Sequence, residues 1–111
     1  AIQRCHGDGA LTFFCAIEEG VVLRLARGVN LVENLATALA EARRAVPRPV
    51  VTLACDCILR RLEIAGNQLE ADVAGLLAEH RVVGFNTYGE QFGSLHVNQT
   101  FTGIMLGERV G

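Results

Sequence analysis

The sequence lacks several features that would assign it to a common class of protein. No run of about 18 apolar residues is present, so we expect no membrane-spanning helix. Its N-terminus also lacks the charged-then-apolar layout of a secretory signal peptide. Neither charge is in large excess, because ten basic and twelve acidic residues give a net charge of -2. This near-balance argues against nucleic acid or an anionic membrane as the main partner.

Signatures of catalysis are also missing. The chain has no G-x-S-x-G elbow, no phosphate-binding loop, no H-E-x-x-H and no nucleophile with a base at readable spacing. Its paired carboxylates, Glu18 and Glu19, fall in a predicted turn, where general acid–base chemistry in a dry cleft is not expected. The sequence therefore predicts a protein that is not an enzyme.

The length fits one domain that is stable without disulfide bonds. A chain of 111 residues buries roughly 65% of its unfolded surface, which is enough for a hydrophobic core. The cysteines, Cys5, Cys15, Cys55 and Cys57, are therefore expected to be free thiols in a reducing, cytoplasmic setting. Because the chain begins at Ala1 rather than Met, we expect it to be a fragment of a longer protein.

Periodicity predicts an N-terminal hairpin followed by a helix. Apolar residues alternate in 11–17 and 21–27 around Glu18-Glu19-Gly20, which is typical of an antiparallel hairpin. From residue 31 to 42, apolar side chains recur every three or four positions, which predicts a helix capped by Asn30. Pro47 and Pro49 end it.

The rest of the chain predicts a mixed sheet. Residues 50–55 read as a strand covered on both faces, and Asp56 reads as the N-cap of a helix. A second helix is predicted over 69–80, and further strands over 82–88 and 95–106, with a turn at 89–93. We predict an α+β fold with one mixed sheet of about five strands in the order 2-1-5-4-3, and helices packed on it.

Uncharged polar residues are concentrated near the C-terminus. In the predicted last strand, His96, Asn98, Thr100 and Thr102 share one face, and no charged residue lies between Glu90 and Glu108. Such groups orient small ligands in pockets because they are desolvated at lower cost than full charges. The same sequence pattern would also result from a hairpin whose Asn and Gln side chains only form hydrogen bonds with nearby backbone groups. The candidate ligand-binding residues are Tyr88, Glu90, Gln91, His96, Asn98 and Thr100.

Three segments carry a resemblance to a known family. GFNTYGEQFGSLHVNQTFTGIMLGE at 84–108 resembles the C-terminal signature of the FIST sensory domain, and CDCILRRLE at 55–63 and FFCAIEEGVVLRLARG at 13–28 resemble its other motifs. The resemblance covers nearly the whole chain, residues 1–111, as a single FIST C-terminal domain from a two-part sensory protein. It implies sensing of small molecules, such as amino acids, in bacterial signal transduction. The implied partners are the N-terminal FIST half and downstream signalling domains, or another copy.

Cofactor chemistry has weaker support in the residues. One subset of the family, the nitric-oxide-sensing proteins, binds haem, and His96 is the best-placed histidine to coordinate it. A histidine hydrogen-bonded within a polar strand is the more common situation. Cys55 and Cys57 are separated by one residue, which is too close for a structural zinc site, and the sequence has no second cysteine pair. We therefore expect buried structural cysteines or a redox-sensitive thiol. Adjacent Arg60 and Arg61 point about 100° apart on a helix, so only one can face a shared pocket.

Overall fold

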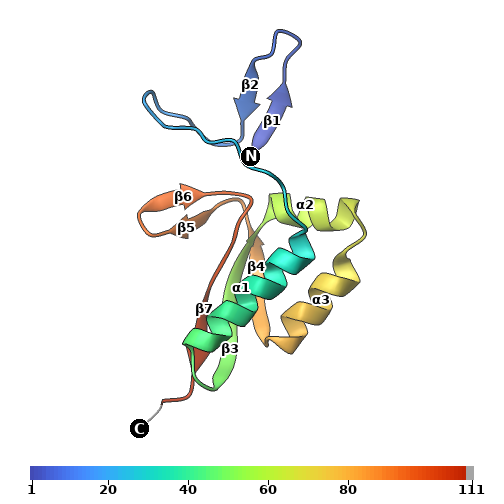
Figure 1. The fold of residues 1–111 in the computed structure, drawn as a ribbon, viewed down its shortest axis with the longest axis vertical. Helices are drawn as coiled ribbons and strands as arrows, with labels where there is room; N and C mark the ends of the chain where they lie inside the picture. The colour runs from blue at the N-terminus through green and yellow to red at the C-terminus, as the bar shows by residue number, and fades with distance from the viewer. Residues whose placement is uncertain (110–111) are drawn as a thin grey trace.

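The computed structural model describes residues 1–109 as a sheet with helices packed on it and two protruding hairpins (Figure 1). Within these residues, β3 lies at the centre of a sheet in the order β4-β3-β7, while β1-β2 and β5-β6 form separate two-stranded sheets. The elements are β1 (Ile2–Cys5), β2 (Leu11–Phe13), α1 (Leu31–Ala45), β3 (Pro49–Cys57), α2 (Ile58–Gly66), α3 (Glu70–Glu79), β4 (Val82–Thr87), β5 (Glu90–Phe92), β6 (Leu95–Val97) and β7 (Phe101–Gly107). The α+β class and the packing of helices on a mixed sheet are thus confirmed.

Helix α1 forms as the sequence predicts. The Asn30 side-chain oxygen accepts hydrogen bonds from the backbone N–H groups of Val32 and Glu33, at 3.0 and 3.1 Å, so the first turn is capped. Leu35 and Leu39 follow Leu31 at helical spacing, and all three are buried. They form the core with Ile64 of α2 and Val73 of α3. The core therefore lies between the helices and one face of the sheet.

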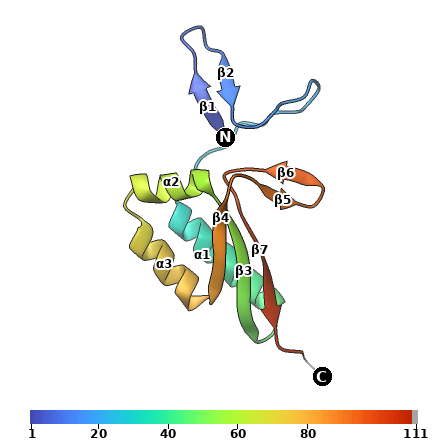
Figure 2. The ribbon, with the colours of Figure 1, turned by 180° about the vertical axis from the view of Figure 1, so that it is seen from behind.

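A helical crossover connects β3 and β4. β3 pairs in parallel with β4, and the intervening chain forms α2 and α3, as a parallel connection requires. On its other side, β3 pairs antiparallel with β7. In Figure 1, α1 lies in front of the sheet, whereas in Figure 2 β3, β4 and β7 lie in front of the helices. The helices therefore cover one face, and the opposite face has no second layer within residues 1–109.

The predicted N-terminal hairpin is wrong in position. β2 contains only Leu11–Phe13 and pairs with β1, whereas residues 14–30 are not in regular secondary structure. The turn forms around Asp8-Gly9, where Gly9 has a φ of +87° and Asp8 accepts a hydrogen bond from the N–H of Ala10. Asp-Gly is a stronger hairpin signal than Glu-Glu-Gly because both residues tolerate turn conformations.

The predicted last strand, 95–106, is broken into two. Gln99 has a φ of +56°, which interrupts the extended backbone between β6 and β7. β6 pairs with β5, which forms in part of the predicted turn 89–93, whereas β7 pairs with β3. The strand order 2-1-5-4-3 and the single sheet of about five strands are therefore wrong. The break also ends the shared polar face that the alternation from His96 to Thr102 predicts.

The start of α2 corrects one further detail. Cys57, not Asp56, occupies the N-cap position, and its side chain makes no capping hydrogen bond. Asp56 is still part of β3, and its carboxylate accepts a hydrogen bond from Arg60 instead. Across residues 1–109, the structure contains no helix with the length and apolarity needed to cross a membrane.

Candidate functional site

A buried polar cluster lies where β3 and β4 end and β7 begins. At its centre is Glu90, whose residue surface is only 2% exposed. The Thr87 hydroxyl donates a hydrogen bond to one of its carboxylate oxygens, and the Thr100 hydroxyl donates to the other at 2.5 Å. The first residue of β5 is thereby fixed to the end of β4 and to the segment just before β7. The β5–β6 hairpin is thus anchored at its base by a buried carboxylate.

An ion pair borders this cluster. The Nε of Arg60 on α2 donates a hydrogen bond to Oδ1 of Asp56, four positions earlier at the end of β3, at 2.6 Å, and both side chains are largely buried. The Arg60 guanidinium also lies 5.8 Å from the centre of the Phe101 ring, within the range of a cation–π contact. Among the described residues, the buried Nη2 of Arg60 has no hydrogen-bond partner. The guanidinium is therefore held by Asp56 and Phe101, with one donor unused.

The surroundings of Asp56 favour its protonated form. Burial raises the pKa of this carboxyl group, and the negative charge of nearby Glu90 raises it further. The hydrogen bond and the positive charge of Arg60 oppose this, but the net pKa remains above its ordinary value of 3.8. The cluster contains two acidic groups and one guanidinium, so its charge depends on whether Asp56 carries a proton.

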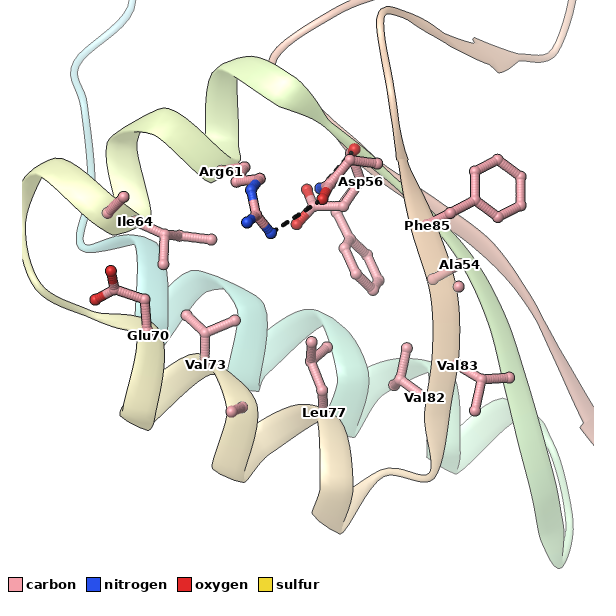
Figure 3. Close-up of a pocket in the computed structure, with 15 residues that line it drawn as sticks. Ala54, Asp56, Arg61, Ile64, Glu70, Val73, Leu77, Val82, Val83 and Phe85 are labelled. Carbon is pink, nitrogen blue, oxygen red and sulfur yellow. Dashed lines mark hydrogen bonds between the residues drawn. The ribbon is translucent and has the colours of Figure 1, made fainter.

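A cavity of about 570 Å³ lies beside the cluster, between α2, α3 and β4 (Figure 3). Its volume is within the range of small-molecule sites. Small residues on the sheet and both helices leave this space open. They are Ala54, Gly84, Ala65 and Ala74. In Figure 3, Val73 and Leu77 point from α3 into the same space, which gives the cavity an apolar wall.

Polar groups meet at one end of the cavity. Arg61 Nη1 donates to Asn86 Oδ1 at 3.4 Å, and Asn86 Nδ2 donates to the Asp56 carbonyl oxygen at 3.2 Å. Glu70, in the first turn of α3, adds a second carboxylate to the lining, but it lies away from Asp56, on the α3 side of the cavity (Figure 3). The cavity thus combines an apolar wall with one guanidinium, one amide and two carboxylates. Such an arrangement can orient a small molecule that carries both charged and apolar groups.

The candidate residues from the sequence lie apart from this cavity. Glu90 and Thr100 meet in the buried cluster, whereas Tyr88, Gln91 and His96 are exposed near or on the β5–β6 hairpin. Asn98 is half-buried, and its side-chain oxygen accepts a hydrogen bond from the amino group of Ala1 at 3.0 Å. None of the six lines the cavity. The structure therefore divides them between the anchor of the hairpin and its surface.

The surroundings of His96 do not fit haem coordination. Its imidazole lies against the backbone of Gly89, the side chain is exposed, and the large cavity is lined by other residues. A haem ligand needs an apolar pocket around the metal, which these residues do not provide. No group of three or more His, Cys, Asp and Glu side chains in residues 1–109 could hold a metal ion.

Sequence reasoning missed the residues that join the cluster to the cavity. Asp56 lies in both, because its carboxylate pairs with Arg60 while it also lines the cavity with Arg61. The four-residue spacing of Asp56 and Arg60 was a readable signal for an ion pair at a helix start. Arg60 and Arg61 do have different surroundings, as adjacent helical positions require. Cys57 is fully buried, so its thiol is not accessible to oxidants.

Comparison with known proteins identifies the family. A family model described as the FIST C domain matches residues 1–93, from the N-terminus to the turn between β5 and β6. No curated protein and no solved structure was found to match the chain. The matched region includes α1, α2, α3 and the central strand, and therefore most of the cavity lining. The chain belongs to the FIST C domain family, whose members are sensory domains in signal transduction.

Proposed function

We propose that this domain binds a small molecule in the cavity between α2, α3 and β4 and transmits its occupancy to the β5–β6 hairpin. The observation that carries this proposal is the double position of Asp56. Asp56 lines the cavity, and its carboxylate also pairs with Arg60 near the buried Glu90. A ligand that interacts with Asp56 thereby acts on the group of charges that anchors the hairpin.

The coupling is electrostatic. A ligand cation near Asp56 would stabilise its carboxylate and weaken the hold of that carboxylate on Arg60. Glu90 lies close enough to influence the pKa of Asp56, so a change of charge at Asp56 also acts on Glu90. Because Glu90 is bound to Thr87 and Thr100, its position sets the base of the hairpin. A ligand changes the population of hairpin conformations only if it binds them with different affinity.

The lining defines the chemistry of the ligand. Arg61 and Asn86 are suited to a carboxylate, Asp56 to an amino group, and the wall of Val73 and Leu77 to an apolar side chain. An amino acid carries these three kinds of group. The proposed role is ligand binding in the cytoplasm rather than catalysis. The hairpin is the surface that an effector domain contacts.

Isothermal titration calorimetry with a panel of amino acids tests this proposal. Ala74→Leu places a larger side chain in the cavity and is expected to abolish the binding heat of the best ligand. The matched control is Ala71→Leu, an exposed position on α3 that does not line the cavity. Arg61→Gln is expected to weaken binding at least tenfold. Loss of a hydrogen bond to a charged group costs about 1.5 kcal/mol, which corresponds to a factor of about ten in the dissociation constant.

The same titration tests the hairpin as a direct ligand site. His96→Ala and Asn98→Ala are expected to leave the affinity unchanged, because neither residue lines the cavity. If these variants lose binding while Ala74→Leu retains it, the ligand lies on the hairpin and the cavity proposal is wrong.

A second function is favoured by the exposed apolar residues of the hairpin. Phe92 and Leu95 are 73% and 68% exposed, and Tyr88, just before β5, is 91% exposed. We propose as the alternative that the hairpin is an interaction surface for the N-terminal FIST half. Substituting Phe92 and Leu95 by Ser in the two-part protein would then separate the halves in limited proteolysis, with ligand binding by this domain unchanged.

A further inference from the structure

The face of the sheet opposite the helices carries a continuous apolar surface, here termed the open face. Side chains alternate along β3, so Leu53 and Cys55 point away from the helices while Thr52 and Ala54 are buried against them. The register aligns Leu53 with Val83 on β4 and with Ile104 on β7. The open face consists of Val51, Leu53, Cys55, Val83, Phe85, Thr102, Ile104 and Leu106. In Figure 3, the side chains of Val83 and Phe85 point away from α3, consistent with this assignment.

These side chains are unusually exposed for residues at the middle of a sheet. Leu53 and Val83 are 51% and 53% exposed, and Phe85 and Ile104 are 69% and 66% exposed. They lie on three adjacent strands, so their exposed areas merge into one patch. Contiguous apolar patches of more than a few hundred Å² are rare on monomers and mark interaction sites. Removal of apolar surface from water favours association.

The composition of the open face fits a second copy of the same chain. None of its eight residues is charged, so a two-fold contact of this face with itself brings no like charges together. Aliphatic side chains on two sheets can interdigitate at a separation of about 10 Å. A stable dimer buries about 800 Å² per partner, and the exposed parts of these side chains supply the apolar centre of such an area.

We propose that two copies of this chain pack their open faces against each other and form a homodimer. In that dimer the two sheets are the inner layers, and α1, α2 and α3 of each copy are the outer layers. The β5–β6 hairpins stay outside the contact because they do not belong to the open face, whereas the cavities border it, since Val83 and Phe85 of the open face also line the cavity. The proposal is independent of whether the cavity binds a ligand.

Sedimentation equilibrium of the purified chain tests the proposal. The unaltered chain is expected to sediment as a dimer at micromolar concentration, and Phe85→Asp as a monomer because it would bury two unpaired carboxylates. The matched control is Leu62→Asp, at a position 62% exposed on α2 and outside the open face, which should remain dimeric. Circular dichroism checks that both variants retain their fold. A dimer broken by Leu95→Asp on the hairpin, but not by Phe85→Asp, would overturn the proposal.

Cys55 supplies a second measurement that needs no substitution. It lies half-buried on the open face, whereas Cys5 and Cys15 are exposed at the N-terminal end. In a dimer, alkylation of Cys55 under native conditions should slow at least tenfold as the protein concentration rises through the dimer dissociation constant. Cys5 and Cys15 serve as references whose rates stay constant. A Cys55 rate that does not depend on concentration, together with a monomeric mass throughout, contradicts the proposal.

Discussion

Glu90 is a carboxylate that is removed from water and held by two hydroxyl groups. Among the described residues, no Lys, Arg or His lies within ion-pair distance of it. Thr87 and Thr100 satisfy its oxygens instead, and both threonines depend on Glu90 as their acceptor. The energetic role of the residue therefore rests on hydrogen bonds rather than on a charge pair.

Glu90→Ala is expected to lower the free energy of unfolding by about 1–3 kcal/mol, because two half-buried hydroxyl groups lose their acceptor. Glu90→Gln retains one acceptor oxygen and removes a buried charge, so its loss should be smaller. Urea denaturation measures both. The control is Glu18→Ala, at an exposed position in the irregular segment 14–30, expected within about 0.5 kcal/mol of the unaltered protein. Equal stability of Glu90→Ala and the unaltered protein contradicts this account.

Asp56 makes stability depend on pH in a defined direction. Its pKa is raised in the folded protein, so between its ordinary value of 3.8 and the raised value the folded state binds more protons than the unfolded state. The contribution of Asp56 to stability is therefore greatest below pH 3.8 and falls as the pH rises through the folded pKa.

Asp56→Asn removes this dependence. The difference in unfolding free energy, variant minus unaltered protein, should increase as the pH is raised from 3.8 through the raised pKa, and then become constant. Urea titrations at stepped pH values measure the difference. Asp72→Asn, at an exposed position on α3, is the control for general effects of charge. A difference that decreases with rising pH would show that the ion pair with Arg60, which lowers the pKa of Asp56, outweighs the effect of burial.

Among the secondary-structure elements, those with local signals could be predicted and those with distant partners could not. Asn30 and the leucines of α1 determine a helix within a few residues of each other, so its start and its buried stripe follow from the sequence. The break at Gln99 has no such signal, because a left-handed backbone usually calls for Gly, Asn or Asp. Residues 21–27 alternate like a strand, yet alternation does not supply a neighbouring strand.

The candidate site shows the same division. The Asp56–Arg60 pair is local and could have been read from its spacing. Thr87 and Thr100 are thirteen positions apart, and they meet at Glu90 only because β4 and β7 flank β3. The sequence did indicate that Glu90 and Thr100 belong to a polar group. It could not indicate that the group is buried at the base of the hairpin.

The cap of α1 provides a test at this level. Asn30→Ala is expected to lower the free energy of unfolding by about 0.5–2 kcal/mol, because the N–H groups of Val32 and Glu33 lose their acceptor. Asn34→Ala, exposed within the same helix, is the matched control and should be neutral or slightly stabilising. Thermal unfolding followed by circular dichroism measures both variants. Equal midpoints would contradict the assignment of Asn30 as the N-cap of α1.

The whole molecule is elongated, with extents of 59 × 33 × 22 Å, because the β1–β2 hairpin and residues 14–30 extend away from the core (Figure 1). Leu25, within that segment, is fully exposed. The core, by contrast, is formed by α1, α2 and α3 against the sheet. Stability is therefore expected to be unevenly distributed along the chain.

Native-state hydrogen exchange should reveal this gradient. Amide groups of residues 14–30 are expected to exchange at nearly unprotected rates, because they lack strand or helix hydrogen bonds. Amides of β3, hydrogen-bonded on both sides, should be the slowest. Protection in 21–27 comparable to that in β3 would mean that this segment pairs with another strand in solution.

One row of small residues has a consequence for engineering. Ala54 lies between Gly84 and Gly103, and a methyl group on either glycine would collide with the β3 backbone, at 2.6 Å from the Leu53 oxygen in the case of Gly103. These two positions are closed to change, whereas the alanines on α2 and α3 face open space across the chamber. The volume of the cavity can therefore be adjusted at Ala65 and Ala74 on the helices, which would let one scaffold be retuned for guests of different length while Asp56, Arg61 and Asn86 are left intact.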